Sequence, residues 1–137
     1  MMRKLLPAFT VICALVAIPA AADTAGLLFV NLTTDESHRA DMAMAFSRGM
    51  MERGHPVVIW LNDKGVLIAA QEHAGKFAPQ QETLAALMND GATVIACPMC
   101  MKHYDVEETD LIEGVQVGNP DLTGDLLFKE DTKTLTW

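Results

Sequence analysis

The sequence predicts an α/β fold in which a mainly parallel sheet carries helices on both faces. Three runs of strand length, residues 26–32, 56–61 and 92–96, are almost entirely apolar. Strands that are buried on both faces have this composition, whereas half-exposed strands alternate apolar with polar residues. Segments with helical spacing separate the runs. This alternation of strands and helices is typical of a parallel sheet.

Two longer helices are predicted between these strands. The first begins at about Ser37, after several candidate N-caps, and ends at Arg53 before Gly54. Its apolar residues recur at spacings of three and four and should face the sheet: Met42, Ala45, Phe46, Gly49 and Met50. The second helix spans residues 80–89, follows an exposed loop at 71–79, and directs Leu84, Leu87 and Met88 inward.

Shorter patterns predict the remaining elements. Residues 62–65, Asn-Asp-Lys-Gly, carry a turn signal, and residues 66–70 fit either a short strand or a helical turn. The acidic residues 105–114 predict a loop. The end of the chain predicts a brief strand at 115–117, a short helix at 121–128 and an alternating edge strand at 132–137.

The first 22 residues have the pattern of a signal peptide. Arg3 and Lys4 precede an apolar stretch, residues 5–18, and three alanines at 20–22 fit a cleavage site. The apolar stretch is short for a membrane span. We therefore expect residues 23–137 to form a single exported, periplasmic domain without a membrane segment.

The charge of the chain excludes one class of partner. It carries 18 acidic against 10 basic residues, a formal net charge of −8, and two of the basic residues lie in the predicted signal peptide. Phosphate backbones are bound by clustered lysine and arginine, and the sequence has no such cluster. We therefore expect no nucleic-acid partner.

The chemistry of the sequence is concentrated in two cysteines. Cys97 and Cys100 directly follow the strand at 92–96, and Pro98 suits the first position of a short helix that continues to Tyr104. The two sulfurs should thus lie at the carboxyl edge of the sheet, where ligands and reactive groups gather. A helix N-terminus favours a thiolate, which is the reactive form of cysteine.

Three uses of this cysteine pair remain open. In the first, Cys97 accepts a sulfane sulfur or is oxidised, and Cys100 resolves the product. In the second, the pair binds Cu(I) with help from Met99, Met101 or His103, because thiolate and thioether ligands select this ion. A structural disulfide is the third, although such a short loop adds only about 2 kcal/mol of stability.

Three segments resemble the DsrE/DsrF-like family of small sulfur-relay proteins. They are residues 26–31, the strand and turn at 58–66, and Val-Ile-Ala-Cys-Pro-Met-Cys at 94–100. The resemblance implies a three-layer Rossmann-like fold, assembly into trimers or hexamers, and a cysteine that carries persulfide sulfur. In this sequence that cysteine is Cys97 or Cys100.

The sequence departs from this family in two respects. The familiar members are cytoplasmic and have one carrier cysteine, whereas this chain has a predicted signal peptide and a cysteine pair. We therefore expect an exported protein that carries persulfide or performs thiol redox through Cys97 and Cys100. Its activity is at most of the sulfurtransferase or thiol-redox type, and its partners are a sulfur-donor or acceptor protein or a small sulfur species. Cu(I) binding is the alternative.

Overall fold

The computed structural model describes residues 25–137, and the predicted signal peptide lies outside this range. The described chain forms a five-stranded sheet in the order β4-β3-β2-β1-β5, with every pair of neighbours parallel. The strands are β1 (Leu28–Leu32), β2 (Val57–Leu61), β3 (Thr93–Ala96), β4 (Gln116–Val117) and β5 (Lys133–Thr136). The predicted α/β class and parallel sheet are confirmed, with β2 as the central strand.

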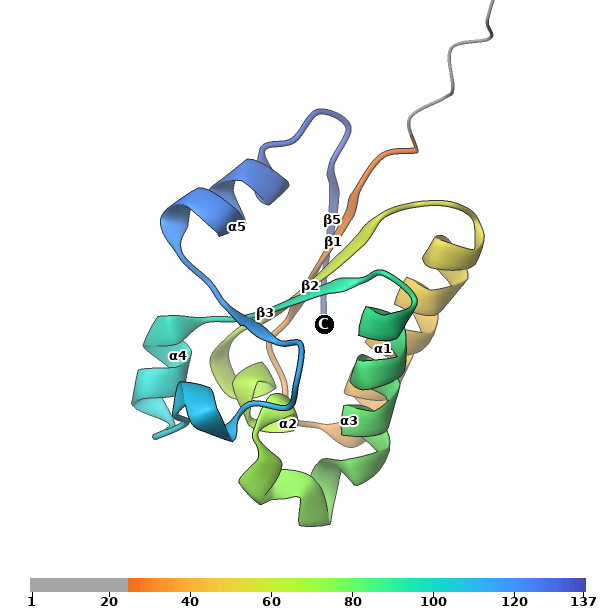
Figure 1. Cartoon of the computed structure of the whole chain (residues 1–137). Helices are drawn as coiled ribbons and strands as arrows, with labels where there is room; N and C mark the ends of the chain where they lie inside the picture. Colours follow the sequence, from red (N-terminus) through yellow and green to blue (C-terminus); the bar gives the residue numbers. More distant parts are fainter. Residues whose placement is uncertain (1–24) are drawn as a thin grey trace, which may run out of the picture.

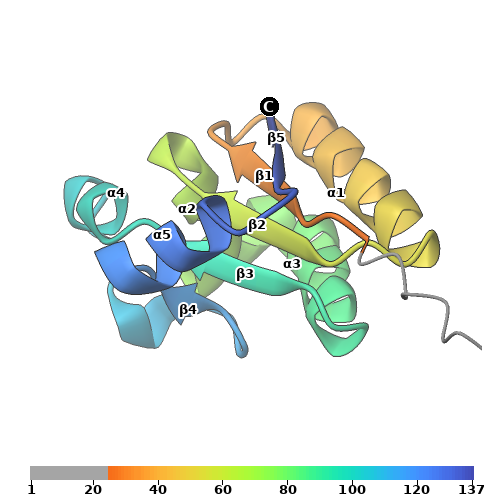
Figure 2. The same cartoon turned by 90° about the horizontal axis from the view of Figure 1, so that it is seen from above.

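Helices cover both faces of this sheet and give the fold three layers. They are α1 (Ser37–Glu52), α2 (Val66–Ala69), α3 (Ala74–Asn89), α4 (Pro98–His103) and α5 (Pro120–Leu127). Figure 1 shows α1 and α3 on one side of the sheet and α5 on the other, and Figure 2 shows β1, β2 and β3 side by side. Within residues 25–137 no helix is long and apolar enough to cross a bilayer.

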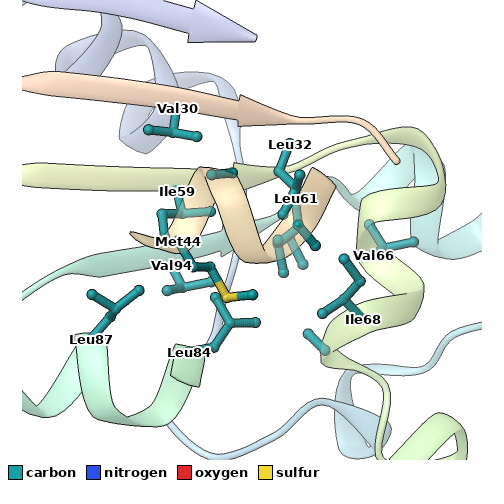
Figure 3. Close-up of a cluster of buried hydrophobic side chains, with 14 of the residues drawn as sticks. Val30, Leu32, Met44, Ile59, Leu61, Val66, Ile68, Leu84, Leu87 and Val94 are labelled. Atoms are coloured by element: carbon teal, nitrogen blue, oxygen red, sulfur yellow. The ribbon is translucent and has the colours of Figure 1, made fainter. Parts of the chain in front are cut away.

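The main hydrophobic core lies between the sheet and the pair α1 and α3. Alternate residues of the strands point into it and meet Met44 of α1 and Leu84 and Leu87 of α3, as Figure 3 shows. The opposite face of the sheet has a smaller core, in which Phe29, Val58 and Ile95 are packed by leucines of α5. The two cores explain why β1, β2 and β3 are apolar at nearly every position.

The predicted inward face of α1 is wrong for Met42, Ala45 and Phe46, which are exposed, whereas Met50 packs against the main core as predicted. The buried residues of α1 are Ala40, Ala43, Met44 and Ser47, while Met42 and Phe46 are 51% and 40% exposed. Small alanine side chains let α1 approach the sheet and α3 closely, and the buried Ser47 hydroxyl donates to the Ala43 carbonyl at 2.8 Å. Apolar residues occur on all sides of α1, so the spacing of apolar residues in the sequence does not indicate which side is buried.

The predicted loop at residues 71–79 is also wrong, because α3 already begins at Ala74 after a 3₁₀ turn at Gln71–His73. Pro79 lies inside α3. It removes one backbone hydrogen bond, but Phe77, which is almost fully buried, anchors this first part of the helix in the core. The inward positions of Leu84 and Leu87 are confirmed, and Met88 is partly buried.

The turn after β2 packs closely against the end of β1 at Gly65. A Cβ atom at this position would overlap the backbone carbonyl oxygen of Leu32, which cannot move without disturbing β1. We expect Gly65→Ala to lower the free energy of unfolding by about 2–4 kcal/mol. Urea denaturation measures this change.

Gly49→Ala is the matched control, because a Cβ at this position in α1 meets no atom within 4 Å. Alanine favours a helix over glycine by roughly 0.5–1 kcal/mol, so this variant should be at least as stable as the wild type. Equal unfolding midpoints for the two variants would contradict the close approach at Gly65.

Candidate functional site

The cysteine pair lies where β3 ends and α4 begins. Cys97 is the N-cap of α4 and Pro98 its first residue, as the sequence predicted. The Cys97 N–H donates to the Leu61 carbonyl of β2 at 2.9 Å, which extends the pairing of β2 with β3 by one residue. Both sulfurs are therefore held at the carboxyl edge of the sheet.

The turn after β2 lies directly beside this pair. Leu61 pairs with Ala96, so Asn62 and Asp63 leave β2 at the level where Cys97 leaves β3. The Cys100 sulfur lies 3.0 Å from Asn62 Oδ1 and accepts a hydrogen bond from the Asp63 N–H at 3.1 Å. The sequence indicated only a turn here, and these contacts with Cys100 were not predicted.

The two thiols also contact each other. Cys100 Sγ lies 2.8 Å from Cys97 Sγ, and both cysteines are free. A thiol has one hydrogen, so the Cys100 S–H serves either Cys97 or Asn62 at a given moment. Cys97 is 8% exposed and Cys100 half-buried, so the sulfurs are shielded but not sealed in the core. The pair is placed to form a disulfide with little rearrangement.

The surroundings of Cys100 keep it protonated. Burial, followed by the hydrogen bond to Cys97, raises the pKa of the Cys100 thiol to about 11, although the Asp63 N–H acts in the opposite sense. Cys100 therefore remains a hydrogen-bond donor at neutral pH. The S–H of Cys100 can therefore be donated to the Cys97 sulfur.

Tyr104 completes the cluster through Asp63. Its hydroxyl donates to Asp63 Oδ1 at 2.5 Å, and this hydrogen bond is the main cause that raises the pKa of Tyr104 to about 12. The same carboxylate also raises the pKa of Cys100 through its charge. Asp63 adopts a left-handed backbone with φ of 47°, a conformation that asparagine and aspartate tolerate better than most residues.

The residues predicted as additional copper ligands lie in different surroundings. Met99 is 82% exposed beside Cys97, whereas Met101 is 5% exposed and packs in the main core. His103 is exposed and stacks edge-on against Tyr104, with ring centroids 4.7 Å apart. Residues 25–137 contain no group of three or more His, Cys, Asp or Glu side chains placed for a metal. Methionine is not among these residue types, and Cu(I) binding by the cysteine pair stays a prediction.

Comparison with known families identifies the fold. The model of the DsrE/DsrF-like family matches residues 26–133. The chain belongs to this family. The resemblance seen in the sequence is thereby confirmed for nearly the whole described domain, and membership suggests a role of the sulfur-relay type. No curated protein sequence matches the chain.

Solved structures agree with this DsrE/DsrF-like assignment. The ychN protein from E. coli is 17% identical with a TM-score of 0.69, covering 82% of this chain and 99% of that one. MTH1491 from Methanobacterium thermoautotrophicum is 18% identical with a TM-score of 0.63, covering 82% and 99%. BT1422 from Bacteroides thetaiotaomicron is 19% identical with a TM-score of 0.61, covering 86% and 100%. The TM-scores show that these proteins share the fold of this chain.

The variant Asp63→Asn tests the role of this carboxylate. Asparagine keeps the shape and tolerates the left-handed backbone but has no charge, so the pKa of Tyr104 should fall from about 12 towards its ordinary value. Tyr104 is the only tyrosine of the chain, which makes ultraviolet titration of the phenol unambiguous. At a pH near 10.5, the wild-type phenol should remain mostly neutral and the variant should be largely ionised.

The pKa of the Cys100 thiol should also fall in Asp63→Asn. Loss of the Asp63 charge lowers the pKa of Cys100, so its alkylation in a Cys97→Ser background should begin at lower pH. Identical titration curves for Tyr104 in wild type and Asp63→Asn would exclude the hydrogen bond as the cause of its raised pKa.

Proposed function

We propose that this protein is an exported, periplasmic member of its family that carries sulfane sulfur or performs thiol redox through Cys97 and Cys100. The observation that carries the proposal is the 2.8 Å contact between the two sulfurs at the carboxyl edge of the sheet. Export rests on the signal-peptide pattern of residues 1–22. Sulfur chemistry rests on family membership.

Cys97 is the proposed acceptor of sulfur. Its thiolate attacks a sulfane sulfur of the donor, forms a new S–S bond at Cys97 Sγ, and breaks the S–S bond of the donor. The donor leaves as a thiolate with the electron pair, so no external oxidant is required. The proton of the Cys100 thiol lies within hydrogen-bond distance and stabilises Cys97 before the attack.

Cys100 is the proposed resolving residue. Its thiol attacks Sγ of the Cys97 persulfide, closes the Cys97–Cys100 disulfide, and releases hydrogen sulfide that takes both protons. With peroxide as the oxidant, Cys97 becomes a sulfenic acid, and attack by Cys100 closes the same disulfide with loss of water. Because the pKa of Cys100 is raised to about 11, resolution should be slow at neutral pH and faster in alkali.

Single cysteine variants distinguish these roles. After treatment with polysulfide, Cys100→Ser should accumulate a persulfide on Cys97, because no second thiol resolves it. Cys97→Ser should acquire at least about tenfold less sulfur, because the remaining thiol stays protonated. Mass spectrometry of the two cysteine peptides measures the added sulfur, and mild peroxide replaces polysulfide in a parallel experiment.

The wild-type protein is the control for resolution. It should show little persulfide and mainly the intramolecular disulfide, and its rate of closure should increase with pH. If neither cysteine acquires sulfur or oxygen and no disulfide forms, the proposal is wrong.

We also propose that the protein forms a homo-oligomer, a trimer or hexamer, which exchanges sulfur with a donor or acceptor protein or a small sulfur species. Besides the family resemblance, the support is an apolar surface along α1 and the edge strand β5. Phe46, Met50 and Leu135 line a hollow of about 500 Å³ there. Monomeric proteins rarely leave large apolar patches uncovered.

The variant Phe46→Glu tests this surface. A charge placed in a buried apolar contact weakens association, so the assembled mass measured by size exclusion with light scattering should fall towards that of a monomer. Asn89→Glu, an exposed residue at the end of α3, is the control and should leave the mass unchanged. A monomeric wild-type protein would refute the proposal.

A further inference from the structure

A shallow groove opens beside Cys97 on the α5 side of the sheet. It has a volume of about 320 Å³ and lies between the start of α4 and the turn that leads from β4 into α5. Trp60 of β2, which points to this face, contributes to its wall. Cys97, Pro98, Met99, Pro120 and Thr123 also line it. Cys97, the proposed acceptor of sulfur, is therefore part of a surface that a ligand can occupy.

The lining of the groove is apolar and uncharged. Among residues 25–137, those that border it include no Asp, Glu, Lys, Arg or His. The chain as a whole carries a net charge of −8, so the surrounding field does not favour an anion. Met99, at 82% exposure, offers a polarisable side chain at the rim. A neutral apolar group is the ligand that this surface stabilises best.

The size of the groove restricts the ligand further. Its volume is at the lower end of the roughly 300–1,000 Å³ that is typical of small-molecule sites. A group of about two aromatic rings, or a branched alkyl group of similar volume, fills such a space. A folded partner requires a much larger contact area.

We propose that the groove binds the neutral, apolar organic part of the sulfur donor, and that the donor is a small hydrophobic hydropersulfide. This inference rests on the proposed function of Cys97 and specifies its substrate. In the reaction, the Cys97 thiolate attacks the terminal sulfur of R–S–SH, and the S–S bond of the donor breaks. A new S–S bond forms at Cys97 Sγ, and R–S⁻ leaves with the electron pair while its apolar group R occupies the groove. Inorganic polysulfide and thiosulfate are poorer donors because they have no apolar part to occupy the groove.

Two disulfide reagents test the preference at Cys97. Dithiodipyridine is a neutral aromatic disulfide, and dithiobis(nitrobenzoate) is an anionic one. Both transfer an aromatic thiol to Cys97 by the same exchange reaction. The experiment uses the full chain with Cys100→Ser, follows the Cys97 peptide by mass spectrometry, and normalises each rate to that of a small free thiol. Salt at about 0.5 M screens the long-range charge of the protein.

The normalised rate should be at least about tenfold higher for the neutral reagent. Met99→Lys places a cation at the rim of the groove, so it should lower this preference by about fivefold or more, chiefly by accelerating the anionic reagent. Asn89→Lys introduces the same charge at the end of α3, beyond the amino end of β3, and should leave the preference unchanged.

Three results would contradict the inference or the proposed function. Equal normalised rates for the two reagents would overturn the groove as a substrate site while leaving Cys97 a working nucleophile. An equal effect of Met99→Lys and Asn89→Lys would attribute the preference to overall charge and would overturn the inference as well. A Cys97 that reacts with neither reagent would refute the proposed function itself.

Discussion

Parallel pairing of β2 with β3 is the constraint on which the site depends. Leu61 lies opposite Ala96, and the Cys97 N–H bonds to the Leu61 carbonyl, so the segments that follow the two strands turn at the same level. A slip of one residue would reverse the faces of β3 and separate Asn62 from Cys100. The hydrophobic cores on both faces of the sheet oppose such a slip. Each side chain of the strand would leave the core in which it is packed and enter the core on the opposite face.

This pairing also makes the two thiols chemically different. Cys100 lies against the turn after β2, where burial and the neighbouring sulfur keep it protonated, with a pKa raised to about 11. Cys97 instead caps α4 and faces the groove on the α5 side of the sheet. Two cysteines three residues apart therefore have different surroundings, because a distant segment, residues 62–63, forms hydrogen bonds with Cys100.

Apolar runs were sufficient to predict the interior strands, since burial on both faces leaves few positions for polar residues. The carboxyl-edge position of Cys97 followed from the strand before it and from Pro98. The inward face of α1 could not be obtained in this way, because methionine and phenylalanine occupy its exposed side while alanines pack against the sheet. The contacts of Asn62 and Asp63 with Cys100 depend on which strands are neighbours and in which register, and a single sequence does not specify either.

The unequal cover of the two sheet faces explains why a groove exists beside Cys97. Two helices of 16 residues pack on one face, whereas α5, with 8 residues, is the helix on the other. Both helices that border the groove begin with proline, Pro98 in α4 and Pro120 in α5. Proline has a fixed φ and no N–H, so the first residue of each of these helices is rigid and offers no backbone donor of its own. A rigid apolar wall loses little entropy when a ligand binds. The same short segments that expose Cys97 therefore also shape the surface on which its substrate would lie.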